Sequence, residues 1–147
     1  MRIPTFTNFF QFHQKPDEGK PWGPPPFQIR LYPDKRIELV IHTGPKSKVV
    51  KLGHYKPKEW NDFAMQVKFA EDKSGFIRLW VNNREYSHSG RPFAFKASER
   101  GQSAPYVKMG SYTGKRRPND KIVLYVDSFR MANNGANLED VYPLNRL

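Results

Sequence analysis

Short runs in which apolar and polar residues alternate constrain the fold of this chain more than any other feature. Residues 27–32 alternate Phe, Ile and Leu with Gln, Arg and Tyr, and residues 36–42 place three apolar residues between polar neighbours. A period of two puts the two sets of side chains on opposite faces of an extended strand, whereas an amphipathic helix needs a period of about 3.6. Pro33-Asp34 between the runs is typical of a tight turn, so the two runs are predicted to form a β-hairpin.

Runs of this kind are spread along the whole chain. We predict strands over residues 5–14, 27–32, 36–42, 49–52, 60–70, 76–82, 105–114 and 121–132. Residues 15–26 contain five prolines and two glycines and are predicted to form a loop. Trp22 in this loop fits either a platform for a sugar ring or an anchor for the loop, and the anchor is favoured. Many short alternating strands predict an all-β protein, an antiparallel β-sandwich, in one domain over residues 1–147.

The net charge points to a polyanionic partner. Lys and Arg number 25 against 14 Asp and Glu, which gives a net charge of +11 at pH 7. A basic surface attracts nucleic acid, anionic polysaccharide or anionic lipid. No OB-type or RRM-type motif is present and no apolar run approaches the ~20 residues of a membrane span, so neither nucleic acid nor membrane is expected as a partner. Cysteine is absent, which excludes disulfides and Cys-based metal sites.

Two of the predicted strands carry polar faces suited to proton transfer. In residues 105–114, PYVKMGSYTG, alternation places Tyr106, Lys108 and Tyr112 on one face. In residues 9–13, FFQFH, it places Gln11 and His13 opposite two phenylalanines. Either stretch alone is more typical of an ordinary sandwich strand. Together they supply an amide, an imidazole, two phenols and an ammonium, which could take a proton from carbon and give one to a leaving oxygen.

The pair QFH and YVKMGSY resembles the signature strands of the polysaccharide lyases of the β-jelly-roll class, Gln-x-His and Tyr-x-Lys-x-Gly-x-Tyr. WNDFAMQVKFAEDKSGFIRLWVNNRE and KIVLYVDSFRMA are similar to the paired central and closing strands of that family, so the resemblance covers nearly the whole chain. The chain is most similar to the heparin-lyase-I-like and glucuronan-lyase-like enzymes, beside the alginate-lyase-like ones. The resemblance implies a concanavalin-like jelly roll and β-elimination on an anionic polysaccharide that contains uronic acid.

The resemblance also implies roles for individual residues. Gln11 corresponds to the amide that binds the substrate carboxylate, and His13 to the base or the group that assists it. Lys108 corresponds to a residue that binds the carboxylate or sets the local field. The catalytic tyrosine corresponds to Tyr112 in the heparin-lyase-I-like pattern and to Tyr106 in the alginate-lyase-like pattern. We favour Tyr112 and keep Tyr106 in the site.

Further basic residues are candidates for contact with a polyanion. Arg116 and Arg117 lie in the loop that follows the tyrosine–lysine strand, where they are expected either to steer an anionic substrate or to form a solvated turn. We include both among the substrate-binding residues. Arg30, Arg36 and His42 also fall on polar strand faces, but charged residues are mostly exposed, so we expect these three to be solvated.

The chain departs from the family pattern at its start. The family's jelly roll has further strands before the Gln-x-His strand, one with an arginine that neutralises the substrate carboxylate, and no such strand precedes Thr5 in this sequence. We therefore expect the chain to correspond to the C-terminal portion of the family's domain and to be weak or inactive as an enzyme. The alternative is a non-catalytic module that binds anionic polysaccharide on the same sandwich.

The resemblance implies no required cofactor and no catalytic metal. It leaves open a structural calcium ion, for which the sequence shows no ligand pattern. It also implies a secreted or periplasmic protein, although residues 1–10 lack the basic start, apolar stretch and cleavage site of a signal peptide. The sequence does not predict an oligomeric state.

Overall fold

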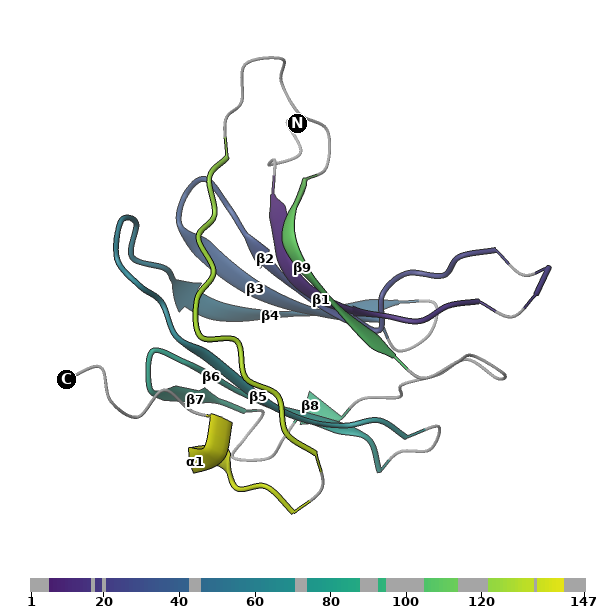
Figure 1. The fold of residues 1–147 in the computed structure, drawn as a ribbon. Helices are drawn as coiled ribbons and strands as arrows, with labels where there is room; N and C mark the ends of the chain where they lie inside the picture. The colour runs from purple at the N-terminus through teal and green to yellow at the C-terminus, as the bar shows by residue number, and fades with distance from the viewer. Residues whose placement is uncertain are drawn as a thin grey trace.

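Two antiparallel β-sheets lie face to face in the described part of the chain (Figure 1). The prediction of an all-β protein with an antiparallel β-sandwich is confirmed. The computed structural model describes residues 6–16, 18–19, 21–42, 46–70, 74–87, 93–94, 105–113, 122–133 and 135–141.

Sheet A has the strand order β4-β3-β2-β1-β9, and each neighbouring pair is antiparallel. Its strands are β1 (Thr7–His13), β2 (Phe27–Leu31), β3 (Arg36–His42), β4 (Ser47–His54) and β9 (Tyr106–Thr113). Strands β1 and β9 are far apart in the sequence but lie side by side (Figure 1). This pairing brings the Gln-x-His stretch next to the tyrosine–lysine stretch.

Sheet B has the order β5-β6-β7, and β8 also pairs with β6. Its strands are β5 (Phe63–Lys68), β6 (Phe76–Val81), β7 (Arg84–Tyr86) and β8 (Phe93–Ala94). Asn82 and Asn83 connect β6 to β7 with φ angles of 49° and 66°. Positive φ at both central residues is what a tight hairpin turn of this length requires.

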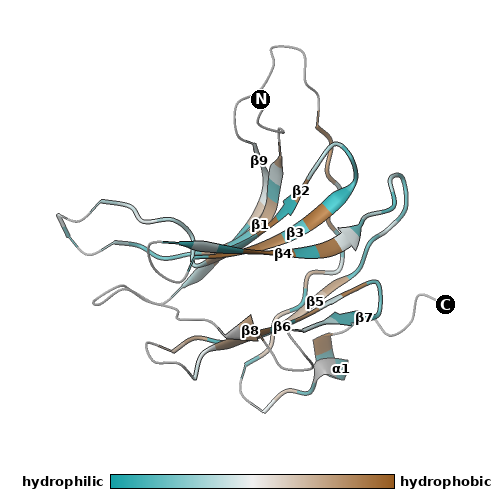
Figure 2. Cartoon of the chain, turned by 180° about the vertical axis from the view of Figure 1, so that it is seen from behind, coloured by the Kyte–Doolittle hydropathy of each residue, from teal (hydrophilic) through white to brown (hydrophobic). Residues whose placement is uncertain are grey.

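The hydrophobic core lies between the two sheets. Hydrophobic and hydrophilic residues alternate along the strands (Figure 2), and the hydrophobic set of each sheet faces the other sheet. Sheet A contributes the fully buried Phe27, Ile29, Ile37, Leu39, Ile41 and Leu52, and sheet B contributes Ile77 and Leu79. Most apolar side chains of sheet A point inward, whereas Val40 and Val49 share the outer face with the polar side chains of the sheet.

One predicted strand is not formed. Within the predicted range of 121–132, residues 122–132 are described and pair with no strand, and their side chains are largely exposed, with Tyr125 at 78% and Met131 at 73%. Figure 1 shows this segment in yellow-green, running from one sheet towards the other without joining either. Alternation is compatible with an extended chain, but ladder hydrogen bonds also require a neighbouring strand. None of the described strands fills that place.

A short helix, α1 (Leu138–Val141), follows this segment. The backbone N–H of Asn137 donates to Oδ2 of Asp140 at 2.6 Å, which is half of the reciprocal cap typical of a helix start. In the described residues, no helix is long and apolar enough to cross a membrane.

Candidate functional site

The candidate site is built on the outer face of sheet A, where β9, β1 and β2 lie side by side. Gln11 on β1 is paired with Lys108 on β9 and with Gln28 on β2. One row further along, Asn8 is paired with Tyr112 and with Arg30. At the other end of the pairing, His13 lies opposite Tyr106. The backbone register thus sets the polar side chains of three strands in adjacent rows.

A β-bulge changes which residues of β1 reach this face. The register shifts between Asn8 and Phe10, so that one extra residue, Phe9, enters β1 relative to β2. Phe10 is part of the core, and Phe9 packs against the core. The ring centroids of Phe9 and Phe63 are 4.7 Å apart. Two consecutive phenylalanines therefore face inward, and Asn8 shares the outer face with Gln11. Strict alternation would have placed Asn8 on the opposite side.

On β9, Gly110 accommodates the register shift that lies opposite Asn8 and Phe10. Its φ is +142°, a conformation that residues with a side chain rarely adopt. A Cβ added there would meet no atom within 4 Å, so the glycine is required by the backbone and not by crowding. Because of this glycine, Lys108 and Tyr112 can both stay on the outer face while their partners on β1 are Gln11 and Asn8.

These side chains surround an open pocket of about 260 Å³. It is lined by Asn8, Gln11, His13, Gly23, Pro25, Gln28, Lys108 and Tyr112. Pockets that hold whole drug-sized ligands are about 300–1,000 Å³. The pocket is therefore suited to a single sugar ring of a longer chain.

The ring of His13 is held in one tautomer. Its Nδ1–H donates to the carbonyl oxygen of Gln14 at 3.0 Å. A neutral imidazole with hydrogen on Nδ1 carries its lone pair on Nε2. The ring also contacts Trp22 edge-on, with 5.1 Å between centroids, and lies 5.9 Å from the ring of Tyr106. In its neutral form, His13 thus carries its lone pair on Nε2 and lines the pocket.

A chain of polar contacts links Arg30 through Gln28 to the amide of Asn8. Gln28 is buried at 4% exposure, and both ends of its amide are satisfied when its oxygen faces Arg30 and its nitrogen faces Asn8. Arg30 Nη2 then donates to Oε1 of Gln28 at 2.6 Å, and Nε2 of Gln28 donates to Oδ1 of Asn8 at 3.0 Å. The same Nε2 lies 2.9 Å from Nδ2 of Asn8, so both polar atoms of the Asn8 amide are next to Gln28. Arg30, Gln28 and Asn8 thus form a polar relay that ends at the pocket.

His42 supports the same relay from β3. Its Nε2 lies 3.3 Å from the amide of Gln28, and the hydroxyl of Ser47 lies 2.8 Å from its Nδ1. Burial lowers the pKa of His42, and the positive charge of Arg30 lowers it further. The expectation that Arg30 and His42 are solvated is wrong, because both are partly buried and hydrogen-bonded to Gln28. Alternation identified their polar face but not the packing of long side chains along it.

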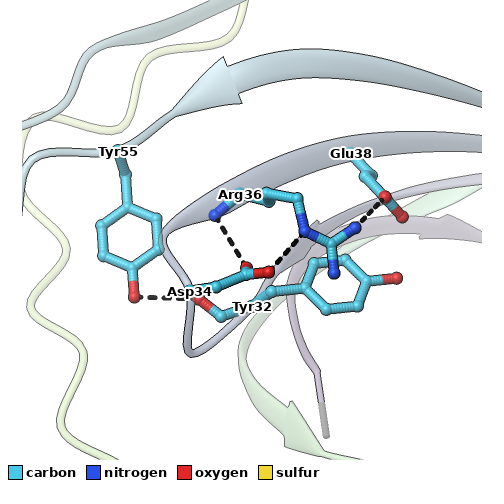
Figure 3. Close-up of polar contacts among 5 residues, drawn as sticks. All are labelled: Tyr32, Asp34, Arg36, Glu38 and Tyr55. Carbon is cyan, nitrogen blue, oxygen red and sulfur yellow. Dashed lines mark hydrogen bonds and ion pairs between the residues drawn. The ribbon is translucent and has the colours of Figure 1, made fainter. Parts of the chain in front are cut away.

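Arg36 is held by acidic partners at the end of the β2–β3 hairpin (Figure 3). Its Nε is 2.6 Å from Asp34 Oδ2, and its Nη1 is 2.8 Å from Oε1 of the buried Glu38. Its guanidinium also stacks 4.3 Å from the ring centroid of Tyr32. Burial raises the pKa of Tyr32, as does its hydrogen bond to Glu38. Arg36 therefore stabilises the turn between β2 and β3 and does not line the pocket.

Most of the site residues predicted from the sequence lie at this pocket. Gln11, His13, Lys108 and Tyr112 line one pocket, and the Lys108 Nζ lies 5.4 Å from the ring centroid of Tyr106, which stands beside it. Arg116 and Arg117 lie outside the described residues. Asn8 and Gln28 line the pocket but were not predicted, the first because of the bulge. Alternation placed Gln28 on a polar strand face, but it could not show that Gln28 lies beside Gln11.

Among the described residues, no group of three or more His, Cys, Asp or Glu side chains could hold a metal ion.

The family of the chain follows from comparison with known proteins. A family model described as polysaccharide lyase matches residues 4–130, which include β1 to β9 and every described residue of the pocket. Searches of curated proteins and of solved structures gave no significant match. The match covers well over half of the chain and includes both strands from which the pocket is built. This chain belongs to the polysaccharide lyase family.

Proposed function

We propose that this chain cleaves an anionic polysaccharide containing uronic acid by β-elimination, with His13 and Tyr112 moving the protons. The observation that carries the proposal is the pocket on sheet A. An imidazole, a phenol, an ammonium and amide groups from three strands converge there in a space suited to one sugar ring. Such groups are the ones that proton abstraction next to a carboxylate requires.

Holding the carboxylate is the first requirement of the reaction. The proton on C5 of a uronate is weakly acidic because C5 carries the carboxylate, and its removal creates an enolate-like state with extra negative charge. Lys108 and Gln11, paired across β9 and β1, are suited to neutralise and hydrogen-bond that group. Asn8, which contacts Gln28 and through it Arg30, would add a further amide to the pocket wall. Arg30 thus acts as a positioning residue without touching the substrate.

Proton transfer is the second requirement. Nε2 of His13 accepts the C5 proton, and the electrons of the C5–H bond form the C4–C5 double bond. The C4–O bond breaks, its electrons stay on the leaving oxygen, and the hydroxyl of Tyr112 protonates that oxygen. Proton exchange with water then returns His13 and Tyr112 to their starting forms. The hydrogen bond from His13 Nδ1 to Gln14 supports this role, because it leaves Nε2 as the acceptor.

The direct test is to look for an unsaturated product. The protein is incubated with polyglucuronate, alginate and heparin in separate reactions, and the ultraviolet absorbance of the new C4–C5 double bond is followed. At least one of these polymers should give rising absorbance, at a low rate because no arginine is among the described residues that line the pocket. A neutral glucan should give none, because it lacks the acidifying carboxylate. Binding of the polyuronates without any rise in absorbance would contradict the proposal.

A further inference from the structure

We infer that Trp22 is a binding platform for the sugar unit next to the one held in the pocket. Trp22 lies in the connection from β1 to β2, which projects beyond the end of sheet A (Figure 1). Gly23 and Pro25 of the same connection line the pocket. Trp22 therefore stands at the rim, beside the wall that its own neighbours form. This inference rests on the proposed function for the identity of the ligand.

The exposure of Trp22 argues against a loop anchor. An anchoring tryptophan contributes by burying its large apolar surface. The side chain of Trp22 is 59% exposed, so most of that surface still faces solvent. The interpretation favoured from the sequence, a loop anchor, therefore does not describe how this side chain is placed.

The contacts of Trp22 are with residues of the site. The ring of His13 meets it at 62° with 5.1 Å between centroids, and Nζ of Lys108 lies 5.8 Å from its centroid. The same ammonium lies 5.4 Å from the centroid of Tyr106, so Lys108 contacts two aromatic rings. These contacts hold the indole at the His13 end of the pocket while leaving much of it open. An aromatic surface that is already oriented loses little freedom when a ligand covers it.

A sugar ring matches this surface chemically. One face of a pyranose presents C–H groups with slight positive charge, and these pack well against the negative face of an indole. The pocket is suited to one ring, so a polymer that enters it must continue over the rim. A pyranose of the same anionic polymer is therefore the ligand that this rim fits.

The test compares oligosaccharides of increasing length. Size-defined oligomers of glucuronic and mannuronic acid are titrated calorimetrically into Tyr112→Phe, which blocks the proposed proton transfer without changing a contact of Trp22. Adding Trp22→Ala should weaken binding of the longer oligomers about tenfold and leave the shortest unaffected. Adding Trp22→Phe should weaken it less. Trp60→Ala, which removes another exposed tryptophan (54% exposed) outside the pocket lining, should change nothing.

Three results would overturn the inference. One is unchanged affinity of Trp22→Ala for every oligomer, and another is an equal loss for all lengths together with lower thermal stability, as a loop anchor predicts. The third is no binding of any oligomer. The ultraviolet assay is read separately, so length-dependent binding through Trp22 without an unsaturated product would contradict the lyase proposal and leave the platform standing. An unsaturated product together with no effect of Trp22→Ala would support the lyase proposal and contradict the platform.

Discussion

At the scale of single residues, the proposed reaction assigns proton acceptance and proton donation to two different side chains of the pocket. His13 has its Nδ1 bonded to the Gln14 carbonyl, which leaves Nε2 to accept a proton. Tyr112 is 68% exposed and stands opposite Asn8, one row away from the pair of Gln11 and Lys108. The two groups approach the pocket from different strands. That arrangement fits a reaction in which a proton leaves one side of a bond and another proton is added at the neighbouring oxygen.

Removing either group should therefore stop catalysis while leaving the substrate bound. His13→Ala and Tyr112→Phe should each lower turnover by about 10²–10⁴-fold, the usual contribution of a general acid or base. Binding of the polysaccharide should stay nearly unchanged, because Gln11 and Lys108 remain. Turnover and the binding constant are measured on the same preparations. His54→Ala and Tyr125→Phe, both at exposed positions outside the pocket lining, serve as matched controls.

The same series decides between the two tyrosines. If Tyr106→Phe lost activity and Tyr112→Phe kept it, the roles assigned to the two phenols would have to be exchanged. Gln11→Ala should impair both binding and turnover, since this amide would contact the carboxylate before and during proton removal. Full activity of both tyrosine variants would rule out the proton transfers drawn here.

His42 should give the protein a dependence on pH. Because burial and Arg30 lower its pKa in the folded protein, the unfolded chain binds a proton at His42 more readily. The stability due to neutral His42 is thus fully present above pH ~6.5, the ordinary histidine value, and lost as the pH falls through the lowered pKa. Denaturant unfolding of the native sequence should show lower stability at about pH 5.5 than at 7.5.

The variant His42→Gln identifies the group responsible. It removes the titrating ring, so its loss of stability over the same pH range should be smaller than that of the native sequence. His54→Gln is the control, because His54 is exposed and should leave the pH dependence as it was. An equal loss of stability in the native sequence and in His42→Gln would show that another group titrates.

At the scale of strands, the site depends on the register between β1 and β9. Gln11 faces Lys108 and Asn8 faces Tyr112 only because the irregularity between these pairs is absorbed near Phe9 and Gly110. The bulge is thus part of the site. It re-aims Asn8 towards the pocket, a common function of bulges next to active sites.

Gly110 provides the test of this register. Gly110→Ala puts a side chain at φ +142°, and such strain costs about 1–3 kcal/mol. The variant should lose unfolding free energy of that order and should also lose activity, because the strand can relieve the strain only by shifting Lys108 or Tyr112. Ser111→Ala, at the next and exposed position, should be nearly neutral. A Gly110→Ala variant with native stability and native activity would show that the register does not depend on this glycine.

The limits of sequence-based prediction are visible at the same scale. Sequence patterns identified β1, β2, β3, β5, β6, β9 and part of β4, and placed Gln11, His13, Lys108 and Tyr112 on outward faces. They could not identify Asn8, because a bulge reverses the parity at one point and leaves no local signal. They also predicted a strand at residues 121–132, since alternation does not show whether a partner strand exists. Strand pairing depends on residues that are far apart in the sequence, and both of these errors concern pairing.

At the scale of the whole molecule, net charge should control how the substrate is captured. The chain carries +11 at pH 7, and exposed charges are screened beyond about 8–10 Å at physiological ionic strength. Binding of a polyuronate should therefore weaken steeply as salt is raised, with most of the change in the association rate. Calorimetry or surface-based kinetics at several salt concentrations measures this. Salt-independent binding, or equal affinity for a neutral glucan, would contradict a role for the charge.

The central claim is that cleavage occurs by elimination, and product mass in water enriched in heavy oxygen tests it most directly. Elimination breaks the C4–O bond without adding water, so the new non-reducing end should be unsaturated, lighter by one water than a hydrolysis product, and free of heavy oxygen from the cleavage step. Products that are saturated and carry one heavy oxygen at the cleaved bond would show hydrolysis and contradict the account.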